Sequence, residues 1–238
     1  MRKEHRFEKM RPRDLARVLE QAPVAFVPLG TLEFHGWHLP FGFDALKALD
    51  LCERVAAKTG GAVLPPAYTG FGGGHRDFEG SILQEEAWTA GMLGRTCDRL
   101  IGMGFRVLVL LTGHYPEEQV AAVQRAAREA MERHPGAVVL GLAEPQAYPG
   151  EFRGDHAAKW ETSIAMHLMP EKVDLRGMES HDDPLYGIGG EDPRETASAA
   201  LGRETVDTIV DVLAAQVREA LTGRAPKPPW YYHNRENP

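Results

Sequence analysis

The chain has 238 residues, of which 43% are hydrophobic and 26% are charged, and its formal net charge is −7. These values are ordinary for a soluble globular protein, and the acidic balance disfavours nucleic acid as a partner because its phosphates would be repelled. A chain of this length buries roughly 70% of the surface that it exposes when unfolded. It therefore needs neither a disulfide nor a structural metal to fold.

The two cysteines, Cys52 and Cys97, are too few for a disulfide framework and lack the spacing of metal ligands. We expect them to be buried thiols. The first residues, MRKEHRFEKMRPRD, are charged and have no apolar core, which is not the pattern of a signal peptide. Because no run of about 18 apolar residues occurs, we expect no membrane association and a cytoplasmic location.

Short apolar runs predict buried strands, and Arg106–Leu111 has the continuous pattern of a strand at the centre of a parallel sheet. Apolar residues at helical spacing, such as Leu46, Leu49 and Val55, predict helices between the strands. The predicted strands are Val24–Pro28, Ala62–Leu64, Arg106–Leu111 and Ala137–Leu142. The predicted helices are Asp44–Lys58, Glu85–Met103, Pro116–Arg133, Ala157–Met169 and Thr196–Thr222.

Strands that alternate with helices imply βαβ units, so we expect an α/β fold with a mostly parallel sheet flanked by helices. Residues 1–225 should form a single domain, because no linker or repeat divides them. The remaining tail, residues 226–238, has no periodicity. Its aromatic residues Trp230, Tyr231 and Tyr232 suggest that it docks on its own domain or on a neighbouring subunit.

Glu33, His35 and Asp44 follow the first predicted strand. Alternate residues of an extended segment point the same way, so Glu33 and His35 converge if this segment is extended. Asp44 stands where the next helix should begin, and ligands of open α/β sheets bind outside the carboxyl ends of the strands. A polar loop in which Asp44 caps the helix is the alternative, so this cluster alone does not decide for a metal site.

His114 comes directly after the predicted strand Arg106–Leu111 and a Thr-Gly pair. Gly113 permits a tight turn that would aim the imidazole across the end of the sheet. A lone histidine is more often structural than a ligand. Two separate strand ends that both offer ligands nevertheless favour a shared site.

Glu161 provides the most informative pattern, because with Ile164, Ala165 and Leu168 it forms a helical face that is otherwise apolar. A carboxylate on a buried face must be paired, be protonated or coordinate a metal. The alternatives to metal binding are that Glu161 pairs with a buried arginine or lies at the edge of the apolar face. His156 is five residues earlier and would point elsewhere within one regular helix, so we expect it in the preceding turn, facing the substrate.

These residues together suit two divalent cations. The ions would bring four positive charges, and Glu33, Asp44 and Glu161 supply three negative charges, with a bridging hydroxide as the fourth. Neutral His35 and His114 would complete the ligand set. Mixed carboxylate and imidazole ligands favour Zn²⁺, which we expect first, or Mn²⁺ or Fe²⁺.

Five segments, in order along most of the chain, resemble the motifs of the creatininase (creatinine amidohydrolase) family. Leu29–Asp44 is similar to the family's opening motif, in which E-x-H-G-x-H-L-P leads to a metal-binding aspartate. Asp155–Ser163 is similar to its D-x-H-A-G-x-x-E-T-S motif. The other three segments are His75–Ile82, Thr112–Pro116 and Gly189–Gly202.

The resemblance implies a creatininase-like three-layer architecture and a homo-oligomer, commonly a hexamer. It also implies a binuclear centre in which Glu33, Asp44 and His114 hold one ion. His35, Asp44 and Glu161 would hold the other, with Asp44 bridging. The chain would then be a hydrolase of carbon–nitrogen bonds, an amidohydrolase whose metal-bridging hydroxide attacks the carbonyl carbon of a small cyclic or amide substrate.

We expect His156 to act as the general acid and base that moves the proton to the leaving group. His75, Tyr115, Phe152 and Trp160 are the candidates that line the substrate pocket. A tryptophan in a helix belongs to the core at least as often as it lines a pocket, so a place in the core is the alternative for Trp160.

Several residues depart from the family pattern near the expected substrate. Thr112 stands where the family usually has asparagine, and Gly74 and Glu79 stand where many members have glutamate and proline. Pro116 replaces a metal-binding glutamate of the creatininases proper, which leaves Glu161 as the second-metal ligand, as in other branches. We therefore do not expect creatinine itself to be the substrate.

Other functions stay open. The family resemblance also implies ring opening of a keto-inositol or deformylation of a formamidopyrimidine as alternatives. The latter substrate carries phosphate, and the chain has neither a P-loop nor a clear basic cluster. An enzyme with one metal is possible if Pro116 distorts the second site, and a metal-stabilised, non-catalytic subunit of an assembly is an alternative of another class.

Overall fold

The computed structural model describes residues 4–152 and 154–223, and within these residues it contains a five-stranded parallel sheet. The strand order is β2-β1-β4-β5, with β3 also paired to β1. The strands are β1 (Val24–Gly30), β2 (Ala62–Val63), β3 (Ala67–Tyr68), β4 (Val107–Thr112) and β5 (Val138–Ala143). Every pairing is parallel. This confirms the predicted parallel α/β sheet.

Strands β2 and β3 lie end to end along one edge of the sheet. Ala62 pairs with Ala25 near the start of β1, and Ala67 pairs with Leu29 near its end. Pro65 and Pro66 lie between the two short strands, and proline has no N–H for a strand ladder. The predicted strand Ala62–Leu64 therefore ends at Val63, and strand pairing with β1 resumes at Ala67, after three intervening residues.

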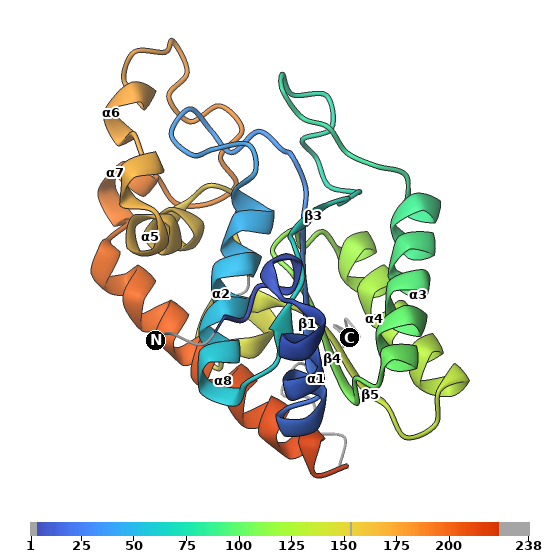
Figure 1. Ribbon diagram of the computed structural model, residues 1–238. Helices are drawn as coiled ribbons and strands as arrows, with labels where there is room; N and C mark the ends of the chain where they lie inside the picture. The colour runs from blue at the N-terminus through green and yellow to red at the C-terminus, as the bar shows by residue number, and fades with distance from the viewer. Residues whose placement is uncertain (1–3, 153, 224–238) are drawn as a thin grey trace, which may run out of the picture.

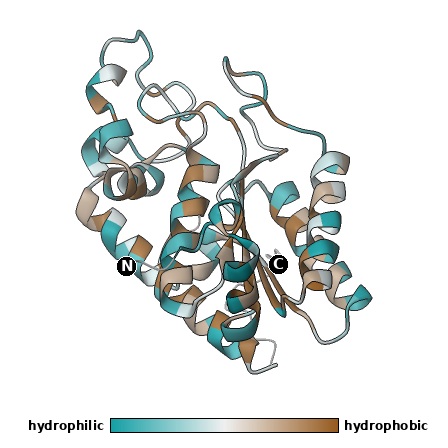
Figure 2. Cartoon of the chain, viewed as in Figure 1, coloured by the Kyte–Doolittle hydropathy of each residue, from teal (hydrophilic) through white to brown (hydrophobic). Residues whose placement is uncertain are grey.

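The two faces of the sheet are covered by different helices (Figure 1), as expected for three layers. Val24 and Phe26 of β1 pack with α2, α5 and α8, whereas Ala25 and Val27 pack with α1, α3 and α4. The longer helices are α1 (Pro12–Gln21), α2 (Phe43–Thr59), α3 (Glu86–Met103), α4 (Glu117–Arg133), α5 (Lys159–Leu168) and α8 (Ala199–Leu221). Figure 2 shows that hydrophobic residues are concentrated on the central strands.

Shorter helical segments occupy the connections. They are η1 (Phe7–Lys9), η2 (Glu144–Ala147), η3 (Pro170–Lys172), α6 (Leu175–Met178) and α7 (Pro193–Thr196). The predicted helix Thr196–Thr222 begins later than expected, because Ser198 is extended and its hydroxyl caps α8 by accepting from the Leu201 N–H. Among the described residues, no helix is both long enough and apolar enough to cross a membrane. The predicted docking of residues 226–238 lies outside the described residues.

Two strand ends press against the start of α2. A Cβ added at Gly113, after β4, would lie 2.1 Å from the Asp44 carbonyl oxygen, and one at Gly30 would lie 2.2 Å from the Ala45 nitrogen. Only glycine fits such close backbone approaches. The first turn of α2, and Asp44 with it, is thereby held over the carboxyl ends of β1 and β4.

A similar close approach joins α5 to α8 and gives a test of the fold. A Cβ on Gly202 would lie 1.8 Å from the Ser163 carbonyl oxygen, so Gly202→Ala should lower the free energy of unfolding by about 1–3 kcal/mol. Gly91→Ala, in the exposed middle of α3 with open space around it, should instead raise it by about 0.5–1 kcal/mol. Urea denaturation measures both values. Equal effects of the two substitutions would contradict the packing described.

Candidate metal centre

Five buried side chains with oxygen or nitrogen donors converge above the carboxyl ends of β1 and β4. Glu33 and His35 lie in the segment after β1, and Asp44 lies in the first turn of α2. His114 follows β4, and Glu161 lies in the first turn of α5. Each of the five residues is at most 3% exposed. The fold thus brings together residues that are up to 128 positions apart in the sequence, from Glu33 to Glu161.

The first donor group consists of Glu33, Asp44 and His114. His114 Nδ1 lies 2.9 Å from Glu33 Oε2 and 3.2 Å from Asp44 Oδ2. One donor atom of each residue lies within 4.8 Å of the other two. This spacing is close enough for one cation to contact all three residues.

The second donor group consists of His35, Asp44 and Glu161, whose donor atoms also lie within 4.8 Å of one another. His35 Nε2 is 3.0 Å from Asp44 Oδ1 and 3.8 Å from Glu161 Oε2. Asp44 therefore belongs to both groups, through a different oxygen in each.

Backbone carbonyl groups fix the orientation of both imidazoles. His35 Nδ1 lies 2.9 Å from the Glu33 carbonyl oxygen, and His114 Nε2 lies 3.1 Å from that of Phe71. A carbonyl oxygen can only accept, so each of these nitrogens carries a proton and donates it. The opposite nitrogen of each ring then faces the carboxylates, which is the usual arrangement of histidines that bind a metal.

The carboxylates and imidazoles perturb one another strongly. Burial opposes the charge of each imidazole, but the carboxylate of Asp44 outweighs it and raises the pKa of His35 to about 9. The same balance, with Asp44 and Glu33 both close to His114, raises the pKa of His114 to about 10. Burial also disfavours ionised Glu33, yet hydrogen bonds from His114 and His75 lower its pKa to about 2. The buried carboxylates therefore favour the protonated, positively charged form of both imidazoles.

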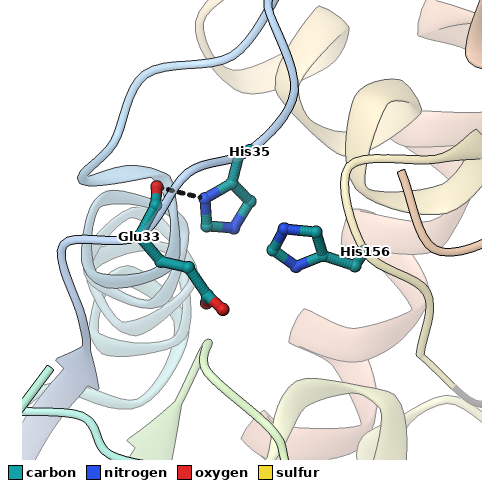
Figure 3. A group of neighbouring side chains, drawn as sticks. All are labelled: Glu33, His35 and His156. Carbon is teal, nitrogen blue, oxygen red and sulfur yellow. Dashed lines mark hydrogen bonds between the residues drawn. The ribbon is translucent and has the colours of Figure 1, made fainter. Parts of the chain in front are cut away.

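His156 lies beside both groups, in the turn before α5, as expected. Figure 3 shows that Glu33, His35 and His156 direct their side chains toward a common space, and their donor atoms lie within 4.8 Å of one another. His156 Nε2 donates to the Phe34 carbonyl oxygen at 2.7 Å, which leaves Nδ1 as the acceptor. Burial, together with His35, lowers the pKa of His156 to about 4, so its ring is neutral and able to accept a proton or bind a cation.

Glu161 is held by neighbours that sequence reasoning missed. Lys47 Nζ lies 2.5 Å from Glu161 Oε1 and 2.6 Å from Glu144 Oε1. Ala157, whose φ is +51°, donates its N–H to Glu161 Oε2 at 2.7 Å. Glu161 is thus both a candidate ligand and an ion-pair partner, although the partner is a lysine and not the arginine that was the alternative.

A signal for Lys47 was present in the sequence. Phe43, Lys47 and Leu51 follow one another at intervals of four residues and are fully buried, whereas Leu46 and Leu49 of the predicted face are only partly buried. The buried face of α2 includes Val55, as predicted, but it runs through Phe43, Lys47 and Leu51 and leaves Leu46 and Leu49 at its margin. Glu144 could have been found by the strand-end argument, because it directly follows β5.

A cavity of about 370 Å³ opens onto these groups. Its polar lining includes Glu33, Asp44, His114, Asp155, His156 and Glu161. Among the described residues, the lining also includes the predicted pocket residues His75 and Tyr115, but neither Phe152 nor Trp160. Phe152 is fully buried in the core and its ring stacks on Trp160 at 5.2 Å. These two residues support the wall of the site from behind.

The donor set fits divalent cations. Asp44 Oδ2 is buried and, among the described residues, makes no hydrogen bond of good geometry, although a buried carboxylate oxygen normally has a partner. Carboxylate oxygens and oriented imidazoles are the ligands that Zn²⁺ and Mn²⁺ accept. An α/β sheet that carries such a buried cluster at its strand ends, beside an open cavity, defines a protein with a candidate metal centre.

Comparison with known proteins agrees with this class. The sequence model of the family described as "Creatininase: Creatinine amidohydrolase" matches residues 8–217. The chain therefore belongs to the creatininase family and is a creatininase-family hydrolase. This confirms the family that the sequence motifs indicated.

Relatives with different reactions match most of the chain. Creatinine amidohydrolase of Pseudomonas putida is 30% identical over 89% of this chain and 93% of its own length. The 3-dehydro-scyllo-inosose hydrolase of Thermotoga maritima is 25% identical over 90% of this chain and 83% of its own length. The mycofactocin precursor peptide peptidase of Mycolicibacterium smegmatis is 27% identical over 63% of this chain and 60% of its own length. Membership of the family thus does not define the bond that is broken.

Solved structures show the same fold. A crystal structure of creatinine amidohydrolase superposes with a TM-score of 0.77 at 25% identity, covering 94% of this chain and 99% of the other. Other creatininase structures, described as an Mn form and as a Zn-Zn type, each superpose with a TM-score of 0.75. Structures in the family therefore include manganese and zinc forms.

Cation binding should stabilise the fold, because it offsets the mutual repulsion of buried carboxylates. At a Zn²⁺ or Mn²⁺ concentration 100-fold above the dissociation constant, the gain is about 2.7 kcal/mol. Thermal denaturation of chelator-treated protein, with and without the ion, measures it as a rise in Tm. His114→Gln should reduce the rise, and His134→Gln, a partly exposed histidine beside Asp98, should not. A Tm that does not respond to either ion would contradict the assignment.

Proposed function

We propose that this chain is a two-metal hydrolase that attacks the carbonyl carbon of a small cyclic or amide substrate other than creatinine. The observation that carries the proposal is the sharing of Asp44 between two donor groups at the floor of one cavity. Glu33, Asp44 and His114 would hold one divalent ion, and His35, Asp44 and Glu161 the other. Zn²⁺ is the first choice, with Mn²⁺ and Fe²⁺ as alternatives.

The chain's own residues would have separate roles beside the ions. Two bound divalent ions would supply an activated water and polarise the substrate carbonyl group. The Phe34 carbonyl oxygen holds His156 in one orientation, so that Nδ1 is free to take a proton and pass it to the leaving group. His75 lies against His156 with ring centroids 3.8 Å apart. This stacking would keep both rings at the edge of the substrate.

The size and lining of the cavity support a small, weakly charged substrate. A volume of about 370 Å³ is near the lower end for ligand pockets. None of the described residues in its lining is lysine or arginine, which disfavours a nucleotide formamide, because its phosphate would need a cationic partner. Gly74 and Pro116 line the cavity at positions that depart from the family motifs. These departures are the reason for excluding creatinine.

Opening of a keto-inositol ring is the second candidate. The resemblance to the 3-dehydro-scyllo-inosose hydrolase extends over 90% of this chain, and the polar lining suits a substrate rich in hydroxyl groups. Such a reaction would break a carbon–carbon bond, whereas the first candidate breaks a carbon–nitrogen bond.

The experiment for the proposed function is a screen of cyclic amides, formamides and keto-inositols with protein of measured metal content. We expect turnover of a cyclic or open-chain amide that is lost on chelation and restored by Zn²⁺ or Mn²⁺, while circular dichroism shows that the fold persists. Turnover of keto-inositols alone would favour the second candidate. Unfolding on chelation without turnover of any substrate would favour the non-catalytic, metal-stabilised subunit.

A homo-oligomer is also proposed, on the resemblance of the motifs alone. Sedimentation velocity of the metal-loaded protein measures the subunit number, for which a hexamer is the expected result. A monomer at micromolar concentration would contradict it.

Glu161→Gln tests the proposed ligand set directly. The amide keeps the shape of the side chain but loses its charge, so turnover should fall by at least about 100-fold, beyond the usual effect of an outer-shell change. Metal analysis should find one ion lost per chain. Glu171→Gln, an exposed change shortly after α5, serves as the matched control and should alter neither value. Near-normal turnover with two ions bound would refute the role of Glu161.

A further inference from the structure

Lys47 is a fully buried cation directly beneath the candidate metal centre. It is 0% exposed and lies one turn after Asp44 on α2. Its Nζ is 2.5 Å from Glu161 Oε1, 2.6 Å from Glu144 Oε1 and 4.0 Å from Asp44 Oδ1. The proposed reaction gives this lysine no role, although an isolated buried ammonium costs several kcal/mol.

Lys47 is enclosed so that it cannot leave its carboxylate partners. The rings of Phe43 and Tyr115 lie 4.9 and 4.7 Å from Nζ, and a cation over an aromatic face is attracted to it. Glu144 does not belong to either donor group, and its Oε2 has no hydrogen-bond partner among the described residues. The ammonium is therefore enclosed between carboxylates and aromatic rings, away from solvent.

The two donor groups differ in their relation to this charge. Glu33, which belongs only to the first group, forms ion pairs with two histidines, His75 and His114. Glu161, which belongs only to the second group, is bonded to the lysine through one oxygen. A cation at the second group must therefore share the Glu161 carboxylate with a positive charge that is already bound. In a buried site such charges repel strongly, because water does not screen them.

We propose that Lys47 makes the two cation positions unequal, with the position at His35, Asp44 and Glu161 the weaker one. This inference rests on the proposed two-metal function. The lysine acts here as a positioning residue, which holds Glu161 in place through one oxygen and lowers the affinity of the second ion. The first ion should bind tightly, and the second should exchange with the medium.

Titration of the metal-free protein with Zn²⁺, by calorimetry and by competition with a chromophoric chelator, tests the inference without a substrate. The wild-type chain should bind two ions, the second about tenfold or more weakly than the first. Lys47→Met removes the competing charge, so the second ion should bind about tenfold or more tightly than in wild type, with the first little changed. Damage to the fold would lower the affinity for both ions. A higher affinity at one position therefore cannot arise from such damage.

Two further variants keep the result interpretable. Lys58→Met removes an exposed lysine from the same helix and should leave both affinities as in wild type. Lys47→Gln, which keeps a donor toward Glu161, replaces the methionine variant if that protein does not fold and should show the same gain.

The outcomes separate the inference from the function on which it rests. Two ions of equal affinity in wild type, or a second affinity that Lys47→Met leaves unchanged or lowers, would overturn the role of Lys47 alone. At most one ion in both wild type and Lys47→Met would overturn the two-metal function itself.

Discussion

The carboxylate of Asp44 faces His114 through one oxygen, at 3.2 Å, and His35 through the other, at 3.0 Å. The surrounding structure holds this buried acid in place. Gly30 and Gly113 let the ends of β1 and β4 approach the first turn of α2 closely. The carbonyl groups of Glu33 and Phe71 then turn both imidazoles toward the carboxylate. A parallel sheet suits this arrangement, because its strands end along one edge and each following segment can contribute a donor.

The centre contains buried acids whose negative charge must be balanced by nearby positive charge. Three acids, Glu33, Asp44 and Glu161, are each at most 2% exposed, and buried carboxylates are costly unless a positive charge faces them. Lys47 supplies one such charge, and burial raises the pKa of Glu144, its other partner, to about 8. The protonated histidines balance the remaining negative charge, and bound divalent ions would balance it in their place. The proposed catalysis and the stability of the fold would therefore depend on the same few groups.

Much of this arrangement could be predicted from the sequence. The central strand β4 and helices α3 and α4 were correct to within one residue, because their apolar patterns are continuous and their ends carry proline or glycine. The helix α1 was missed, since Val18 is its only buried residue in a mostly charged segment. Edge strand β3 was also missed, because two residues of pairing leave no pattern.

The candidate site likewise contains residues that could be predicted from the sequence and residues that could not. Glu33, His35, Asp44 and His114 could be placed together because each follows a strand or begins a helix, and Glu161 because it interrupts an apolar face. Phe152 and Trp160, which are predicted to line the pocket, are not among the described residues of the cavity lining, and their rings stack on each other. Lys47 escaped notice because a lysine is almost never buried, and only its spacing from Phe43 and Leu51 indicates otherwise.

We propose that Asp44 is shared by two cations. A crystal structure of the Zn²⁺-loaded protein, with anomalous differences measured at the zinc absorption edge, tests it most directly. We expect two peaks, one among Glu33, Asp44 and His114 and the other among His35, Asp44 and Glu161. A lone peak that does not contact Asp44, or no peak within these residues, would contradict it.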